Sequence, residues 1–135
     1  MVVQRKRPVV EPYESSEHRA LADWLDRCGL FWEHVPMGGK RSKRQGQILR
    51  AMGARPGSPD FRIYDRVGPY IGAAIELKRE VSGKPSKQQT DFLEKLEKRG
   101  WAVTVAHGAD AAIAWLKGLG FRPSEATSSR PRVDG

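Results

Sequence analysis

The sequence predicts a single α/β domain in which helices pack on one small mixed sheet, and three observations predict it. Segments with the helical spacing of apolar residues alternate with short apolar strand segments along the chain. The 135 residues are too few to build two stable cores. Both ends of the chain are polar and contain prolines, which leaves about 100 residues for the core.

The first half of the chain predicts two helices and two strands. The first helix runs from about Ser16 to Cys28, because its apolar residues recur at helical spacing. A serine at position 15 or 16 can cap its start, and Gly29 suits its end. The later segments are a strand at 30–35, a glycine-bounded basic stretch at 38–47, a short helix at 47–52 and a strand at 60–64.

The second half predicts two strands and two helices. The most apolar strand candidate runs from Tyr70 to Lys78. Ser86 is suited to cap a helix from Lys87 to Arg99, and a strand from Trp101 to His107 follows. A last helix begins at a cap on Asp110. With the short helix included, the predicted order of elements is αβαββαβα.

The two ends of the chain and its single cysteine limit the domain boundaries and the cellular locations that we expect. Residues 1–13 and 122–135 are charged or polar, so we expect an N-terminal tail, a domain at 14–121 and a disordered C-terminal tail. Cys28 alone excludes a disulfide within the chain and a cysteine-based zinc site. We find no signal peptide and no apolar run that would cross a bilayer. We therefore expect no membrane partner and a location in the cytoplasm, or in a host-cell compartment that holds nucleic acid.

The charge balance of the chain is strongly basic. Lys and Arg number 24 against 16 Asp and Glu, which gives a formal net charge of +8. Such a charge on a small domain favours a polyanionic partner. Charge alone does not separate nucleic acid from an acidic membrane surface, and it carries no information about catalysis.

The strand at 70–78 ends in two charged residues on one face. Alternate side chains of a strand share a face, so Glu76 and Lys78 point the same way, while Ile75 and Leu77 point to the other layer. An isolated Glu-x-Lys is usually a surface pair. Here Asp60 begins the preceding strand, and a hairpin of two adjacent strands brings its carboxylate beside Glu76.

Two carboxylates at this distance predict a divalent cation. Each carboxylate raises the pKa of the other, and a bound cation removes the repulsion. Hard oxygen ligands in a partly solvated site favour Mg²⁺ or Mn²⁺. With Asp60 and Glu76 on the metal, Lys78 lies next to a phosphate or an attacking water.

The order of these motifs resembles a known nuclease family. Pro59-Asp60 followed by Glu76-Leu77-Lys78 resembles the PD-(D/E)XK signature of restriction-type nucleases. The wider pattern is more similar to the VRR-NUC family of that superfamily, over roughly residues 14–117. Its parts are Glu17, a basic segment at 40–55, the run Gly53-Ala-Arg-Pro-Gly-Ser-Pro-Asp60, the Glu-Leu-Lys strand end, and the run Gly83-Lys-Pro-Ser-Lys-Gln-Gln89. The resemblance implies a restriction-endonuclease-like core.

The resemblance also implies a role for each matching residue. The implied metal ligands are Asp60, Glu76, the Leu77 carbonyl and Glu17, the last directly or through water. Lys78 matches the catalytic lysine, and Gln89 matches a glutamine that supports the site; Gln88 replaces it if the register slips by one. Glu17 and Gln89 also extend the apolar stripes of their helices, although first-turn polar residues are common for other reasons. Ser58 departs from the family pattern, in which a small aliphatic residue is commoner.

A basic segment leads into the Pro59-Asp60 turn. Between positions 40 and 55 it carries no acid, and its cations are Lys40, Arg41, Lys43, Arg44, Arg50 and Arg55. A solvated face is the ordinary explanation for such a run, but its place favours contacts with backbone phosphates, with strong salt dependence and little reading of bases. Gly38 and Gly39 allow the segment to order on DNA. His34, just before the segment, is a further candidate for the site or a phosphate.

These features together predict a metal-dependent DNA endonuclease. The resemblance implies a homodimer that acts on branched DNA such as a Holliday junction, in DNA repair. A flap- or end-processing nuclease, a nickase and an archaeal-type junction resolvase have the same catalytic residues and remain open. An alternative of another class is a non-catalytic DNA-binding module on the same fold.

Overall fold

The structure is a computed structural model, and it describes residues 12–35, 42–79 and 82–124. The elements in chain order are α1 (Pro12–Arg27), β1 (Trp32–His34), α2 (Lys43–Ala51), β2 (Phe61–Ile63), β3 (Gly72–Lys78), α3 (Lys87–Glu97), β4 (Trp101–His107) and α4 (Ala109–Leu119). The expected order of helices and strands is confirmed. No helix among the described residues is long and apolar enough to cross a membrane.

The sheet has four strands in the order β1-β2-β3-β4. The β1–β2 and β2–β3 pairs are antiparallel, whereas β3 and β4 are parallel. A parallel pair needs a crossover connection, and α3 supplies it here. The sheet is therefore mixed, as the sequence predicts.

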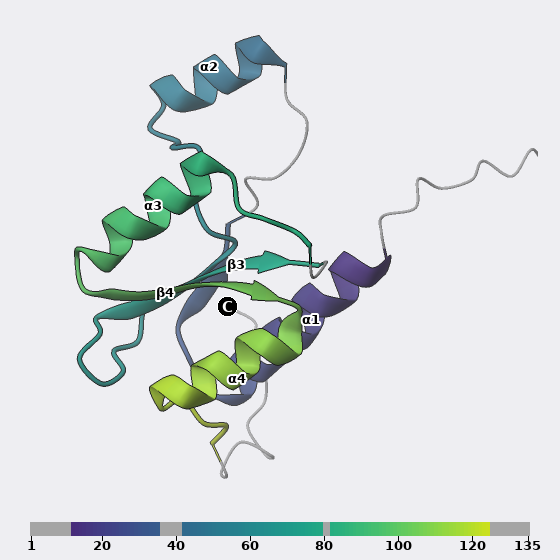
Figure 1. Cartoon of the computed structure of the whole chain (residues 1–135), viewed down its shortest axis with the longest axis vertical. Coiled ribbons are helices and arrows are strands. Elements are labelled where there is room, and N and C mark those ends of the chain that lie inside the picture. The colour runs from purple at the N-terminus through teal and green to yellow at the C-terminus, as the bar shows by residue number, and fades with distance from the viewer. Residues whose placement is uncertain (1–11, 36–41, 80–81, 125–135) are drawn as a thin grey trace, which may run out of the picture.

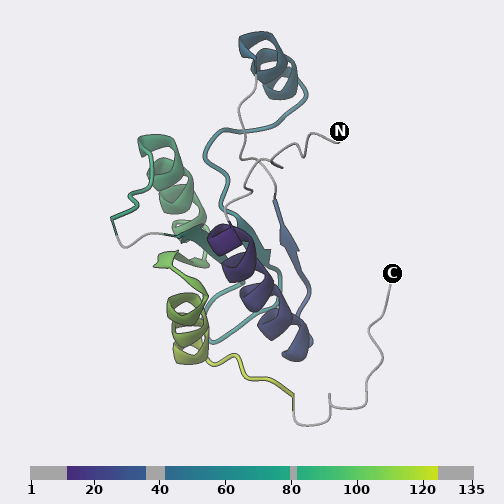
Figure 2. The same ribbon diagram turned by 90° about the vertical axis from the view of Figure 1, so that its right-hand side faces the viewer.

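Helices cover both faces of this sheet (Figures 1 and 2). On one face α1 and α4 lie together and enclose the main core, in which Leu21, Phe61, Ile75 and Leu116 are fully or almost fully buried. On the other face α3 packs along β4. Because β3 side chains alternate between the two faces, Ile75 and Leu77 join the main core and Glu76 does not.

The domain extends beyond the expected boundaries at both ends. Helix α1 begins at Pro12, inside the expected tail, and proline is well tolerated in the first turn of a helix. At the other end, the Ser124 N–H donates to the Arg27 carbonyl, and the Arg122 guanidinium donates to the Lys117 carbonyl. The remainder of both tails, 1–11 and 125–135, lies outside the described residues.

Helix α2 is longer than expected and stands apart from the sheet. It begins at Lys43 and not at Gln47, because Ser42 and Gln45 form a capping box that was not recognised in the sequence. None of its residues is buried, and Figure 1 shows it projecting from the rest of the domain. Half of the basic segment that we expected as a loop is therefore helical.

Other boundaries differ by a few residues. Strand β3 begins at Gly72 and not at Tyr70, because Tyr70 pairs with Val67 across the preceding turn. Helix α3 ends at Glu97, two residues before the predicted end. The N-cap of α4 is Gly108, so Asp110 lies in the first turn of the helix and is not its cap.

Candidate active site

Two neighbouring strands bring Asp60 to Glu76. In the antiparallel register Phe61 lies opposite Ile75, so Asp60, one residue before β2, reaches the end of β3. Its carboxylate oxygen Oδ2 accepts a hydrogen bond of 2.8 Å from the Leu77 N–H. This contact continues the ladder with a side chain in place of a carbonyl, and it holds the Asp60 carboxylate beside Glu76.

Glu76 is a buried acid without enough partners. Only 4% of its surface is exposed, and its oxygen Oε1 forms no hydrogen bond with any described group. Burial, and next the charge and hydrogen bonding of Asp60, raise the pKa of Glu76 to about 8, against the opposing effect of Lys78. The Glu76 carboxyl is therefore mostly protonated at neutral pH, and a cation that replaces this proton would ionise it.

Lys78 is held in place by the first turn of α3. Its Nζ lies 3.1 Å from Gln89 Oε1 and 3.5 Å from Glu76 Oε2. The same Gln89 oxygen accepts from the Ser86 N–H, while Ser86 Oγ accepts from the Gln89 N–H, so the two residues form a capping box. Gln89 is thus the glutamine that faces the site, and Gln88 points elsewhere.

Glu17 lies at the same end of the sheet but faces α4. Its Oε2 accepts a hydrogen bond of 2.8 Å from the Ala109 N–H, which caps the start of α4 in the place where we expected Asp110. The adjacent Gly108 donates its N–H to the Lys78 carbonyl, so α1, α4 and β3 meet here. The role of Glu17 as a metal ligand stays a prediction, because one of its oxygens is already engaged.

The remaining donor set suits a hard cation that keeps much of its water. The described residues contain no group of three or more His, Cys, Asp and Glu side chains that could hold a metal. Asp60 and Glu76 offer two carboxylates, and the Leu77 carbonyl points to the same edge, since the neighbouring Lys78 carbonyl faces β4. Mg²⁺ is commonly bound through one or two carboxylates, waters and substrate phosphates. The residues present therefore fit Mg²⁺ or Mn²⁺.

Two histidines pack next to this edge of the sheet. The rings of His18 and His34 have centroids 5.0 Å apart, and each contacts the ring of Phe61. Burial and His18 lower the pKa of His34, while the Asp60 carboxylate raises it, which places His34 near the acid pair. Sequence reasoning missed His18 as a neighbour of His34, because nothing local indicates that α1 carries it to β1.

The basic residues do not form one continuous loop. Lys43, Arg44 and Arg50 are exposed on α2, whereas Arg55 lines a pocket against α3. The predicted contacts Lys40 and Arg41 lie outside the described residues. That pocket also contains Lys95 and Arg99, which sequence reasoning missed although their spacing of four residues places them on one helix face.

Comparisons with known proteins identify the family and the fold of this chain. A family model of the VRR-NUC domain matches residues 13–110, which contain Asp60, Glu76 and Lys78. A solved structure described as a VRR_NUC domain protein has a TM-score of 0.65 and 21% sequence identity, over 79% of this chain and 86% of that one, and this likeness shows the fold. The comparison with curated proteins gives no match. Because the family model covers more than half of the chain, the protein belongs to the VRR-NUC family of nuclease domains.

Proposed function

We propose that this chain is a metal-dependent DNA endonuclease that hydrolyses phosphodiesters at a centre formed by Asp60, Glu76 and Lys78. The observation that carries the proposal is the buried Glu76 carboxyl, which lies near Asp60, has one oxygen without a hydrogen-bond partner and faces Lys78 with the other. Burying Glu76 beside a second acid, at a surface that must accept phosphate, costs stability. A non-catalytic DNA-binding module does not need such a pair.

The metal, Mg²⁺ or Mn²⁺, would be held by Asp60, Glu76 and the Leu77 carbonyl, with Glu17 contributing through water. When bound, it polarises the scissile phosphate and lowers the pKa of a bound water. The hydrogen bond from the Leu77 N–H keeps the Asp60 carboxylate oriented in this role. Glu76 must lose its proton to hold the cation.

Lys78 supplies a fixed positive charge to the reacting phosphate. An ammonium has three donors, and Gln89 and Glu76 occupy two of them. The third remains for a phosphate oxygen or the attacking water, where it stabilises the negative charge that grows in the transition state. Gln89 acts as a positioning residue, because it contacts Lys78 and holds the ammonium through the start of α3.

The DNA backbone would approach along the exposed cations of the basic segment. Lys43, Arg44 and Arg50 are exposed on α2, and Arg55 follows toward the Asp60 turn. We include Lys40 and Arg41 in this surface from the sequence. Binding through phosphates predicts a steep loss of affinity with salt.

A homodimer with structure-selective cleavage of branched DNA is the finer form of this proposal. The apolar residues Ile48 and Met52 of α2 and its C-cap are exposed, at 50% and 78%. At about 100° per residue they lie on the side of α2 opposite Lys43 and Arg50. A second copy that covers them leaves both basic faces open, and two active sites suit a Holliday junction. A nickase or an end-processing nuclease is the alternative, and the DNA panel below separates them by the substrate that is cut.

Cleavage of a panel of labelled DNAs tests the proposal: linear duplex, single strand, flap, splayed arm and four-way junction, each in Mg²⁺, Mn²⁺ and EDTA. We expect metal-dependent cutting, strongest on branched DNA, that falls by about 10²-fold or more in Asp60→Asn and Lys78→Met. The matched controls Asp110→Asn and Lys117→Met change exposed residues of α4 and should cut normally. Tight, salt-sensitive binding without cutting by the unaltered protein would instead identify a DNA-binding module.

A further inference from the structure

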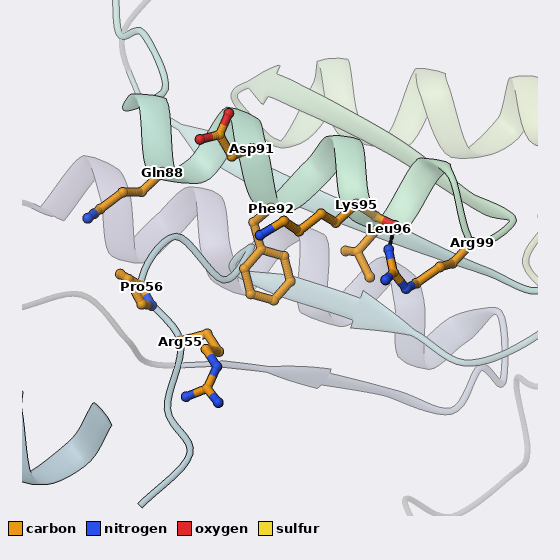
Figure 3. Close-up of a pocket in the computed structure, with 8 residues that line it drawn as sticks. All are labelled: Arg55, Pro56, Gln88, Asp91, Phe92, Lys95, Leu96 and Arg99. Atoms are coloured by element: carbon orange, nitrogen blue, oxygen red, sulfur yellow. Dashed lines mark hydrogen bonds between the residues drawn. The ribbon is translucent and has the colours of Figure 1, made fainter. Parts of the chain in front are cut away.

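A pocket of about 450 Å³ lies between the outer face of α3 and the segment that precedes β2 (Figure 3). Its rim carries three cations, Arg55, Lys95 and Arg99, and its apolar part is formed by Phe92 and Leu96. The volume is within the range of about 300–1,000 Å³ that is usual for ligand pockets. The acid pair of the active site does not line it.

The cations of this pocket have no acidic partners among the residues that the structure describes. Arg55 donates to the carbonyls of Arg50 and Ala54, and Arg99 donates to the carbonyl of Lys95. The single acid of the rim, Asp91, lies 3.8 Å from Lys87. The rim therefore has a net positive charge that an anionic ligand would complement.

The apolar part of the pocket offers a flat surface next to these cations. Figure 3 shows the Phe92 ring projecting from α3 toward the loop of Arg55 and Pro56, with Leu96 one turn further along. The Arg62 guanidinium stands 5.4 Å from the ring centroid and packs on the ring from the sheet. An aromatic surface beside unpaired cations suits a flat base that carries a phosphate. A duplex backbone or an acidic peptide would pair with the cations but would place no flat group against the Phe92 ring.

The two segments that border the pocket also build the active site. Gln88 lines the pocket, and the next residue, Gln89, holds Lys78. The loop before β2 packs closely on the same turn, since a Cβ added to Gly57 would lie 2.4 Å from the Gln88 carbonyl oxygen. Asp60 follows Gly57 by three residues. From Gln88 to Leu96 the helix axis covers roughly 12 Å. That length matches a few nucleotides of a strand at about 3.4 Å each.

We propose that this pocket binds an unpaired nucleotide of the DNA strand that leaves the active site. The base lies against Phe92, and the phosphate is held by Arg55, Lys95 and Arg99. The inference rests on the proposed function, because it assumes that DNA is the substrate bound at Asp60 and Glu76. It gives the enzyme a preference for branched DNA with a single-stranded arm, because a blunt duplex has no unpaired base to place there.

Fluorescence anisotropy with two labelled DNAs tests the pocket without cleavage. One DNA is a blunt duplex and the other is the same duplex with a single-stranded arm, and both are titrated with the full chain in EDTA. The unaltered protein should bind the armed DNA about tenfold more tightly. Lys95→Glu and Arg99→Glu should remove this preference and reduce the slope of log affinity against log salt by about 1. Phe92→Leu, which keeps apolar packing, should lower armed-DNA affinity about fivefold with the slope unchanged.

Lys117→Glu is the matched control, because Lys117 is an exposed lysine of α4 on the opposite face of the sheet. Equal arm preference in Lys95→Glu and Lys117→Glu, with melting temperatures unchanged, would overturn the proposal. Binding of an acidic peptide that is lost in Lys95→Glu, with DNA binding unchanged in the same variant, would also overturn it.

Cutting is measured separately in Mg²⁺, so that the two proposals fail in different ways. Arm preference that persists in a protein without cleavage supports the pocket and refutes the nuclease. Cleavage without arm preference refutes the pocket alone.

Discussion

Glu76 shows how a single side chain links burial to chemistry. The carboxyl is almost completely enclosed, and burial and Asp60 raise its pKa to about 8. In the absence of metal the folded protein therefore holds a proton here that an unfolded chain would release near pH 4.5. Under the proposed function, a bound cation would replace this proton.

The raised pKa of Glu76 makes the free energy of unfolding depend on pH. Between about pH 4.5 and 8 the folded state binds more protons than the unfolded state, so this group's contribution to stability is complete below pH 4.5 and is lost as pH rises through about 8. In EDTA, we expect the free energy of unfolding of the unaltered protein to fall from pH 5 to pH 9, relative to Glu76→Gln, by up to about 4 kcal/mol. Urea unfolding of both proteins measures the difference, and parallel pH curves would contradict it.

At the scale of elements, the start of α3 is the part of the fold on which the site depends most. It carries Ser86 and Gln89, which cap the helix and hold Lys78. The loop before β2 packs directly on this turn at Gly57. The positions of the Asp60 and Lys78 side chains therefore depend on the contact between the loop before β2 and the start of α3. Strands β2 and β3 do not provide this contact.

Gly57→Ala tests that contact. At φ +86° any side chain is strained, and the added Cβ would also meet the Gln88 backbone at 2.4 Å. Gly53→Ala is the matched control, because Gly53 has φ +106° but open space around its Cβ position. We expect Gly57→Ala to cost at least about 1 kcal/mol more than Gly53→Ala in urea unfolding and to lower kcat for DNA cleavage. Equal effects would mean that the loop and α3 are not in contact.

The two capping boxes predict unequal effects of the same substitution. Ser86→Ala should lower the free energy of unfolding by about 1 kcal/mol, because α3 packs on the sheet and unfolds with it. Ser42→Ala should leave the thermal transition nearly unchanged, since α2 has no buried residue and contributes little to the core. Calorimetry of both variants measures the contrast, and similar losses would show that α2 is integral to the folded unit.

At the scale of the whole molecule, α2 is an amphipathic helix without a partner in the described part of the chain. Its apolar residues Ile48 and Met52 are exposed, and Lys43 and Arg50 lie on the other side of the helix. Phe31, at 72% exposure, is a second apolar site on the surface, next to Tyr64. A homodimer through α2 would give the shape that two-strand cleavage of a junction needs.

Sedimentation of Ile48→Glu/Met52→Glu tests the dimer. We expect the unaltered protein to sediment as a dimer and the double variant as a folded monomer, because four buried carboxylates would oppose the interface. Phe31→Glu, the comparison variant, should remain dimeric. A monomeric unaltered protein, or dissociation by Phe31→Glu alone, would contradict the role of α2.

The sequence by itself determined the order of elements, the mixed fold class and the proximity of Asp60, Glu76 and Lys78, because strand alternation and hairpin spacing are local patterns that place side chains directly. Only the tertiary structure decided that Glu17 caps α4 across 92 positions of the chain. It also decided that Lys95 and Arg99 share a pocket with Arg55. Contacts between distant segments arise from packing of whole elements, so no short pattern in the sequence contains them.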